Sequence, residues 1–314
     1  MTATTQRPLK IGIGLPDAVG QMAGGTARWS DLLAMARRAE EAGFDSVWVE
    51  DHLLFRLNDT PVEGPWECWS LLSALAASTS RVEIGPLVAC TSFRNPALLA
   101  KMADTVDEIS GGRLILGLGA GWHEPEYQAF GYPFDHRVSR FEEALQIIHS
   151  LLRTGKVDFE GKYYQARECE LLPRGPRPEG PPIWLGTTGP RMLGLTATYA
   201  DGWNTYFNRH KNDPAGIAPL RESIDAVCIE HGRDPATLER TCAVLVSFEG
   251  DTSAPSSANP SGTPPLTGSP EEIAESLRGF AAEGISHVQV WLEPNDLAGI
   301  EGFVPVLELL DAGE

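Results

Sequence analysis

Residues 81–126 constrain the fold of this chain more than any other stretch. They contain two apolar, β-branched-rich runs at 82–88 and 113–118, and apolar residues recur at three- and four-residue spacing over 96–109. This pattern predicts two parallel strands, buried on both faces, with a helix between them. We therefore expect an α/β fold built on a βαβ unit.

The residues that follow these two strands point to a ligand site. The first strand leads into Ala-Cys-Thr-Ser-Phe-Arg-Asn-Pro at 89–96, and the second into Gly-Leu-Gly-Ala-Gly-Trp-His at 117–123. Small residues let a backbone approach a ligand closely, and the carboxyl ends of parallel strands form the ligand-binding rim of a (β/α)-barrel. We expect the functional site at this rim.

The rest of the chain repeats the strand-helix pattern at spacings typical of a (β/α)8 TIM barrel, an α/β fold. Expected strands lie at 9–15, 46–50, 82–88, 113–118, 183–185, 201–205, 241–248 and 287–292. Expected helices lie at 30–42, 67–78, 96–109, 136–152, 191–199 and 214–232. A further helix is expected from 269 onward, and a last one at the chain end. Ser30 is expected to cap the first helix. At 314 residues this makes one domain spanning 1–314.

Three insertions are predicted in the barrel. Residues 122–135 lack periodicity and are expected to be irregular, and 154–170 alternate about Glu160-Gly161 as a β-hairpin does. Residues 249–268, which follow strand seven, are rich in Ser, Pro and Gly. We expect a mobile loop there, which orders over bound ligands.

Composition and charge exclude several classes of partner. A formal charge of −18 would repel nucleic acid and anionic membranes. The five cysteines are scattered without a Cys-x-x-Cys pair, which predicts reduced thiols, and no run reaches 18 apolar residues. The first residues contain no apolar signal-peptide core, so we expect a cytoplasmic protein.

Two other folds fail on local sequence. A Rossmann domain needs Gly-x-Gly-x-x-Gly leading into a helix, whereas Gly117, Gly119 and Gly121 are followed by Trp-His-Glu-Pro, which does not begin a helix directly. A metal-dependent hydrolase on this barrel typically has His-x-His in strand one, and Ile-Gly-Ile-Gly at 11–14 offers no ligand. No metal centre is expected.

Several stretches resemble the bacterial luciferase-like monooxygenase superfamily, in particular its branch of deazaflavin (coenzyme F420)-dependent oxidoreductases. The matching stretches are Ile-Gly-Ile-Gly at 11–14, Ser-Val-Trp-Val-Glu-Asp-His at 46–52, Ser-Phe-Arg-Asn-Pro at 92–96, Ser-Gly-Gly-Arg-Leu at 110–114, Gly-Ala-Gly-Trp at 119–122, Ala-Asp-Gly-Trp at 200–203, Gly-Ser-Pro-Glu-Glu-Ile at 268–273 and Gly-Ile at 284–285. Close relatives in this superfamily use reduced FMN and oxygen instead of F420. The resemblance also implies a homodimer.

The resemblance assigns the flavin-like ring to the carboxyl ends of the strands. It implies a non-proline cis peptide at Leu87-Val88 behind the ring, a carboxylate at Asp51 beside it, and a proton-transferring histidine at His52. The alternatives are an ordinary bulge at 87–88, Asp51 as a cap or ion-pair partner, and His52 as a polar residue at a strand end. Imidazole titrates near neutrality and suits that role. Ala120, Gly121 and Trp122 are implied as further cofactor contacts.

The turn at 186–189 is a candidate phosphate site. Its residues, Gly186, Thr187, Thr188 and Gly189, precede an expected helix, whose N-terminal N–H groups attract anions. The resemblance implies that the cofactor phosphate lies there. A plain turn with a helix cap is the alternative, because TIM barrels often bind phosphate after strands seven and eight.

One position departs from the sugar-phosphate dehydrogenase relatives. Their acidic proton donor after strand four corresponds to Trp122 here, so Glu124 or Glu126 replaces it or no acid is needed; we take Glu126 as the candidate catalytic acid. A phosphosugar is therefore a poor substrate candidate. Aromatic residues at the rim suggest a larger, less charged organic molecule, although any of them can belong to the core: Phe55, Trp66, Trp122 and Phe207.

Three functional hypotheses follow. The first is hydride transfer between coenzyme F420 and a small-molecule substrate, with His52 moving the proton. The second is monooxygenation by FMN, which a separate flavin reductase would deliver reduced. The third is a binding protein that has lost turnover, which retention of Asp51 and His52 disfavours.

Overall fold

The computed structural model describes residues 7–23, 25–57, 61–248, 259 and 261–313. Contacts within the chain group these residues into two compact units. The first unit comprises residues 1–48 and 203–314, and the second comprises residues 49–202. The prediction of a single domain stays a prediction.

The first unit contains a parallel sheet whose strands follow the order β2-β1-β11-β10-β9. Its strands are β1 (Lys10–Gly14), β2 (Ser46–Val49), β9 (Gly202–Thr205), β10 (Glu239–Ser247) and β11 (His287–Glu293). The register aligns Ile13 with Val47 of β2 and with Val290 of β11. Almost every side chain of β1 and β11 is buried, as expected for parallel strands covered on both faces.

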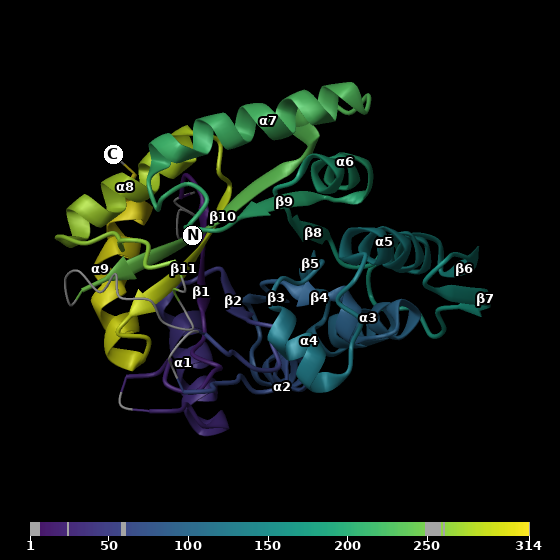
Figure 1. The fold of residues 1–314 in the computed structure, drawn as a ribbon. Helices are drawn as coiled ribbons and strands as arrows, with labels where there is room; N and C mark the ends of the chain where they lie inside the picture. Colours follow the sequence, from purple (N-terminus) through teal and green to yellow (C-terminus); the bar gives the residue numbers. More distant parts are fainter. Residues whose placement is uncertain (1–6, 24, 58–60, 249–258, 260, 314) are drawn as a thin grey trace. The chain divides into compact units, whose positions relative to one another are not determined.

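Amphipathic helices cover this sheet. They are α1 (Trp29–Ala42), α7 (Ile217–Glu230), α8 (Pro270–Ala282) and α9 (Leu297–Ala312), with short 3-10 turns η2 (Pro214–Gly216) and η3 (Pro235–Thr237). Helix α9 packs against α1 and α8, and Figure 1 shows α8 and α9 side by side. Helix α8, expected from 269 onward, begins with a capping box, because Ser269 and Glu272 cap each other's backbone N–H groups.

The second unit contains the strands that carry the predicted rim. These strands are β3 (Glu83–Pro86), β4 (Ala89–Cys90), β5 (Leu116–Gly119) and β8 (Ile183–Gly186). Strand β5 pairs in parallel with β4 and β8, and Ile84 bridges in parallel to Leu114. The strand predicted at 82–88 is therefore interrupted between β3 and β4.

The helices of the second unit begin and end at recognisable signals. Its helices are α2 (Cys68–Ser78), α3 (Pro96–Ser110), α4 (Glu124–Phe130), α5 (Arg137–Thr154) and α6 (Pro190–Tyr199), with the turn η1 at Thr91–Phe93. Asn95 caps α3 by accepting hydrogen bonds from the N–H groups of Ala97 and Leu98. Helix α3 packs against α2 and α5.

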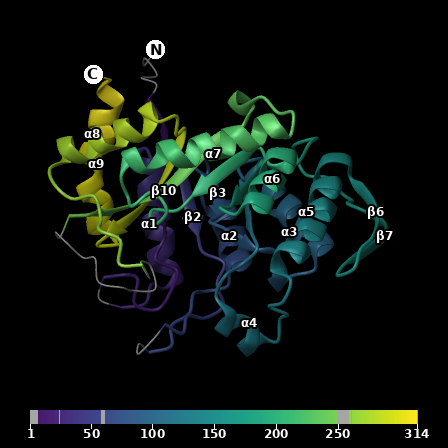
Figure 2. The same cartoon turned by 45° about the horizontal axis from the view of Figure 1, so that its top comes forward.

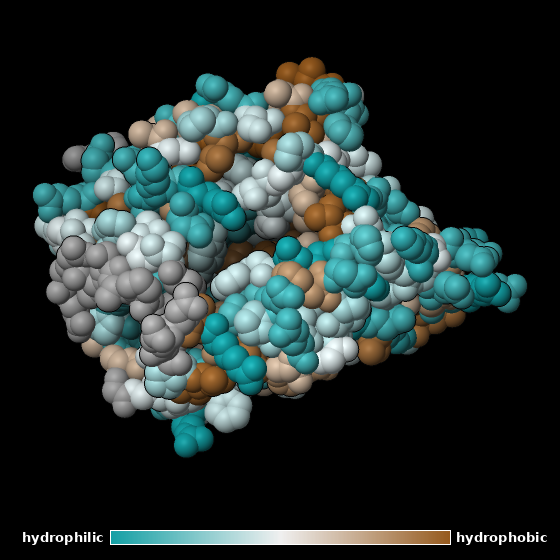
Figure 3. Space-filling model, in the orientation of Figure 1, coloured by the Kyte–Doolittle hydropathy of each residue, from teal (hydrophilic) through white to brown (hydrophobic). Residues whose placement is uncertain are grey.

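The inserted hairpin is confirmed as β6 (Lys156–Glu160) paired with β7 (Gln165–Glu170). It extends beyond α5 in both ribbon views (Figure 1 and Figure 2). Hydrophilic residues cover its tip (Figure 3). Glu143 of α5 holds the turn by accepting hydrogen bonds from the N–H groups of Lys162, Tyr163 and Tyr164.

Two local expectations were wrong. Residues 122–135 are not irregular throughout, because they contain α4; Glu124 and Glu126 in its first turn suit the helix dipole, and Pro125 is tolerated there. Helix α1 is not capped by Ser30, since it begins at Trp29, and Asp31 accepts a hydrogen bond from the Arg28 N–H. The predicted loop at 249–268 lies largely outside the described residues.

Three global expectations concern membranes, metals and thiols. Within the described ranges, no helix combines the length and apolarity needed to span a bilayer. The same residues contain no group of three or more His, Cys, Asp or Glu side chains placed to hold a metal ion. All five cysteines are free thiols, as predicted.

Two buried histidines of the first unit predict an acid-sensitive fold. Burial lowers the pKa of His287 to about 3 and that of His210 to about 4. In the unfolded chain each histidine binds a proton near pH 6.5, whereas in the folded chain it is still neutral at that pH. Protonation therefore favours the unfolded chain. The contribution of each neutral histidine to the free energy of unfolding is complete above about pH 6.5 and is lost below it. When the pH falls from 7.5 to 5.5, each histidine lowers the free energy of unfolding by about 1.4 kcal/mol.

We expect the variant His287→Asn to remove about 1.4 kcal/mol of this pH dependence, measured as the free energy of unfolding in urea at both pH values. His231→Gln, a change at an exposed histidine, is the matched control and should leave the dependence unchanged. An identical pH dependence in wild type and His287→Asn would contradict the assignment.

Candidate active site

The predicted polar pair lies directly after a buried strand. Asp51 and His52 follow β2, and the N–H of Leu87 donates a hydrogen bond of 2.9 Å to the Val49 carbonyl, so the end of β3 runs beside them. The side chain of Asp51 is almost completely buried, whereas that of His52 is 16% exposed. Asp51 and His52 are therefore in different environments, although they are adjacent in the chain.

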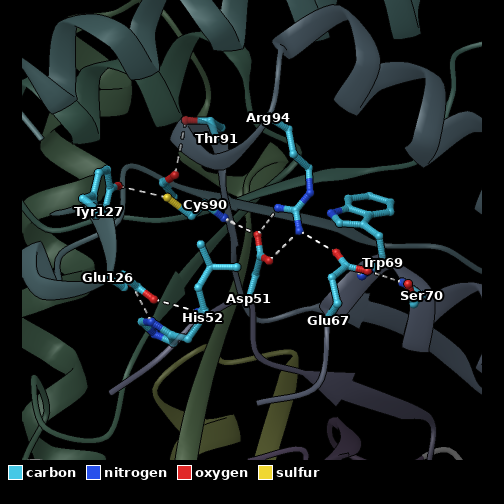
Figure 4. Close-up of polar contacts among 12 residues, drawn as sticks. Asp51, His52, Glu67, Trp69, Ser70, Cys90, Thr91, Arg94, Glu126 and Tyr127 are labelled. Carbon is cyan, nitrogen blue, oxygen red and sulfur yellow. Dashed lines mark hydrogen bonds and ion pairs between the residues drawn. The ribbon is translucent and has the colours of Figure 1, made fainter. Parts of the chain in front are cut away.

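Asp51 forms a buried ion pair with Arg94, which lies between η1 and α3. Arg94 Nη1 and Nη2 donate to the two oxygens of Asp51 at 2.6 and 2.9 Å, and the Cys90 N–H donates to Oδ2 at 2.9 Å (Figure 4). Arg94 Nη2 also donates to Glu67 at 2.7 Å. This two-point pairing is the strong form of an arginine–carboxylate contact.

The electrostatics of this pair depend on both partners. Burial raises the pKa of Asp51, while the Arg94 guanidinium and the Cys90 N–H oppose that rise by stabilising the carboxylate. The pKa of Arg94 is raised, because its carboxylate partners outweigh the effect of its own burial. Asp51 is thus a charge-compensated side chain whose two oxygens are both bound.

Glu67 connects this pair to helix α2. Its carboxylate accepts hydrogen bonds from the N–H groups of Trp69 and Ser70, at 3.2 and 2.7 Å, and so caps the helix. These contacts, together with that from Arg94, help to lower the pKa of Glu67, although partial burial acts against them. One guanidinium therefore ties the start of α2 to the end of β2.

His52 contacts Glu126 on helix α4. The distance from His52 Nδ1 to Glu126 Oε1 is 2.9 Å, and the Leu53 N–H donates to Glu126 Oε2 at 2.8 Å. A carboxylate accepts hydrogen bonds, so His52 carries its proton on Nδ1, and Nε2 is the nitrogen that can exchange a proton. Two residues predicted as catalytic are in direct contact.

Glu126 controls the protonation of His52. Burial opposes a charge on the imidazole, but the hydrogen bond to Glu126 and the negative charges of Glu126, Glu50 and Asp51 outweigh it. The pKa of His52 is therefore raised above its usual value. Glu126 itself is buried, and its two oxygens contact His52 Nδ1 and the Leu53 N–H.

The predicted contacts Ala120 and Gly121 pack against a buried pair from β4 and α4. Tyr127 Oη donates to the Ala120 carbonyl at 2.9 Å and lies 3.0 Å from Cys90 Sγ. Gly121 has φ of +72°, and a Cβ there would lie 1.9 Å from Tyr127 Oη. Burial raises the pKa of Cys90 to about 12, so this thiol is structural and unreactive.

The cis peptide predicted at Leu87-Val88 is confirmed. Val88 lies over glycines of β5 and β8: a Cβ on Gly119 would come within 2.7 Å of Val88 Cγ2, and one on Gly186 within 3.3 Å. Because these positions have no side chains, the half-buried Val88 lies close against the strand ends. The result is a flat apolar surface, against which one face of a planar ring can pack.

The predicted phosphate turn joins β8 to α6. Thr187 is buried with its hydroxyl 2.9 Å from that of Thr196, whereas Thr188 is exposed. No atom lies within 4 Å of a Cβ built on Gly189, the residue before α6, so there is open space at this helix start. Of the two threonine hydroxyls, that of Thr188 is the accessible one.

Trp122 lies beside His52. Its indole is 52% exposed, and its ring centre lies 5.6 Å from that of the imidazole at an interplanar angle of 76°. Phe55, predicted as a rim residue, is buried 4.5 Å from the His52 ring. Trp66 is exposed and Phe207 is fully buried, so Phe207 belongs to the core of the first unit.

Arg94, Glu67 and Tyr127 had no role assigned from sequence. A signal existed for Arg94, since a basic residue that follows a buried strand at the rim needs an acidic partner. Its partner Asp51 lies 43 residues away, and no spacing rule links the two. Glu67 caps α2 and Tyr127 lies within α4, and neither position carries a comparable signal.

Comparisons with known proteins identify relatives of this chain. The profile of the luciferase-like monooxygenase family matches residues 9–256. The chain is 30% identical to 5,10-methylenetetrahydromethanopterin reductase of Archaeoglobus fulgidus, over 71% of this chain and 62% of that protein. It is 36% identical to pyrimidine monooxygenase RutA of Methylorubrum populi, over 60% of this chain and 50% of that protein.

A solved structure supports the predicted fold. An F420-dependent secondary alcohol dehydrogenase, in complex with an F420-acetone adduct, matches with a TM-score of 0.80 and 22% identity, over 96% of this chain and 99% of that one. This likeness confirms the predicted (β/α)8 barrel class. The chain spans about half to three fifths of the length of the two curated relatives.

We expect Arg94→Met to destabilise the protein by about 3–5 kcal/mol, because it leaves the Asp51 carboxylate buried without its partner. Adding Asp51→Asn should recover part of this loss. Arg191→Met is the control, since the Arg191–Glu142 pair is exposed and such pairs contribute less than about 1 kcal/mol. Chemical denaturation gives the free energy of unfolding of wild type, Arg94→Met, Arg94→Met with Asp51→Asn, and Arg191→Met. Equal losses in Arg94→Met and Arg191→Met would contradict the assignment of a buried ion pair to Arg94 and Asp51.

Proposed function

The chain belongs to the family of luciferase-like monooxygenases, and on that premise we propose that it is an oxidoreductase that transfers a hydride between coenzyme F420 and a small organic substrate. The observation that carries this proposal is the His52–Glu126 contact at 2.9 Å. Hydride transfer to or from a carbon must be matched by a proton, and His52 is positioned and tuned to move one. The F420-dependent dehydrogenase with the same fold supports this choice of cofactor.

The described residues fit a flat cofactor with a phosphate. Val88, lying over Gly119 and Gly186, supplies an apolar surface for the ring, and Ala120 and Gly121 provide backbone beside it. The open space at Gly189 and the exposed Thr188 suit a phosphate at the start of α6. When bound, coenzyme F420 would supply or accept the hydride.

Each polar residue then has a distinct role. His52 Nε2 donates a proton to the substrate in the reductive direction and accepts one in the reverse direction. Glu126 is a positioning residue that holds the imidazole through Nδ1 and keeps its pKa raised. Asp51, compensated by Arg94, supplies a fixed carboxylate and no proton.

Monooxygenation with reduced FMN and oxygen is the second candidate. The identity with a pyrimidine monooxygenase favours it, and the surface at Val88 fits either ring. A flavin reductase would then be a required partner. In both cases we propose a homodimer, on the basis of family resemblance.

A titration of the apoprotein with oxidised F420 and, in parallel, FMN decides between the two candidates. We expect micromolar binding of F420, followed by its fluorescence, and at least about tenfold weaker binding of FMN, a difference of about 1.4 kcal/mol. Tighter binding of FMN would replace hydride transfer with monooxygenation, and binding of neither cofactor would contradict both.

The variant Glu126→Gln tests the role of the carboxylate. Without that charge the pKa of His52 falls, so the rate of substrate reduction should decline with rising pH from a lower pH than in wild type. NMR titration of the His52 ring measures the same shift without turnover. Glu124→Gln, an exposed change on the same helix, is the control.

Removal of His52, the proposed proton donor, gives the reference against which the rate lost in Glu126→Gln is compared. His52→Ala should lower kcat by about 10²–10⁴, the usual contribution of general acid catalysis. Glu126→Gln should lose less, because the imidazole remains. An unchanged His52 titration in Glu126→Gln would show that Glu126 does not tune this histidine.

A further inference from the structure

Trp122 is an exposed aromatic side chain beside the proton-transferring residue. It follows β5, its indole is half exposed, and the edge-on contact with His52 has a centre-to-centre distance of 5.6 Å. A large aromatic ring that is left out of the core next to a reacting group offers contact area to a ligand.

The position of Trp122 is held by its neighbour. His123 is buried, its ring lies 5.1 Å from that of Trp122, and its Nε2 accepts a hydrogen bond of 3.0 Å from the Arg56 N–H. Burial lowers the pKa of His123, which keeps Nε2 unprotonated and able to accept. Phe55, on the adjoining segment, exchanges two backbone hydrogen bonds with Glu63. Trp122 therefore packs against a neighbour that is itself held in place, which limits the entropy lost on binding.

The charges around His52 disfavour an anionic substrate. Glu126, Glu50 and Asp51 each act on His52 with negative charge, and Arg94 is engaged by Asp51 and Glu67. A carboxylate or phosphate placed at His52 would meet this excess of negative charge at short range. With Nδ1 bound to Glu126, protonated His52 offers Nε2–H to an uncharged acceptor such as a carbonyl oxygen.

We propose that Trp122 is a substrate-binding residue, and that the substrate is a flat, uncharged carbonyl compound whose face packs on the indole and whose oxygen meets His52 Nε2. This inference rests on the proposed function for the role of His52. The contact with Trp122 can be measured without turnover.

Acetophenone and 4-acetylbenzoate form a matched pair of probes, because they differ only in one carboxylate. Calorimetry with the full chain, with and without bound F420, gives the dissociation constant of each. We expect acetophenone to bind at least about tenfold more tightly than 4-acetylbenzoate. Trp122→Ala should weaken acetophenone about tenfold, whereas Trp122→Phe should stay within about threefold of wild type.

The variant Trp122→Glu tests whether the contact area of the indole or the charge at position 122 determines the binding of the two probes. It should weaken acetophenone as Trp122→Ala does and should not improve the binding of 4-acetylbenzoate. Phe130→Ala, at another exposed aromatic side chain of the second unit, is the control and should leave both constants unchanged. Equal binding of acetophenone by wild type and Trp122→Ala, or a preference for 4-acetylbenzoate, would overturn the inference.

The outcomes separate this inference from the proposed function. If F420 binds and Trp122→Ala leaves acetophenone binding unchanged, the substrate assignment fails while the proposed function stands. If F420 does not bind but acetophenone still depends on Trp122, the proposed function fails and the binding surface stands.

Discussion

The buried ion pair between Asp51 and Arg94 is the contact on which the rest of the described site depends. Two hydrogen bonds join the end of β2 to the segment before α3, and Glu67 extends the connection to the start of α2. A buried carboxylate is costly unless it is paired and hydrogen-bonded, so each partner requires the other. The pair holds in place the backbone that leads into His52.

His52 and Asp51 are adjacent in the chain but do different work because their partners differ. Asp51 has both oxygens bound by a cation and a backbone N–H, whereas His52 has one nitrogen bound by a carboxylate and one available. Burial alone would keep the imidazole neutral, and Glu126 reverses that tendency. A paired carboxylate and an imidazole with one nitrogen available are thus placed side by side.

Glycines shape the strand ends of the second unit. Gly119 and Gly186 leave room for Val88, and Gly121 leaves room for the Tyr127 hydroxyl. A Cβ would lie 2.7 Å from Val88 Cγ2 at Gly119 and 1.9 Å from Tyr127 Oη at Gly121, so this close packing requires glycine at both positions.

The sequence by itself determined most of the order of strands and helices, the hairpin, and the placement of Asp51, His52 and the glycines at strand ends, because periodicity and turn chemistry are local. It missed α4. Family resemblance added the cis peptide at Leu87-Val88, which the structure contains. Only the tertiary structure decided that Arg94 pairs with Asp51 and that Glu126 binds His52, across 43 and 74 residues. Contacts between residues so far apart follow from how the strands pack, and no local pattern encodes them.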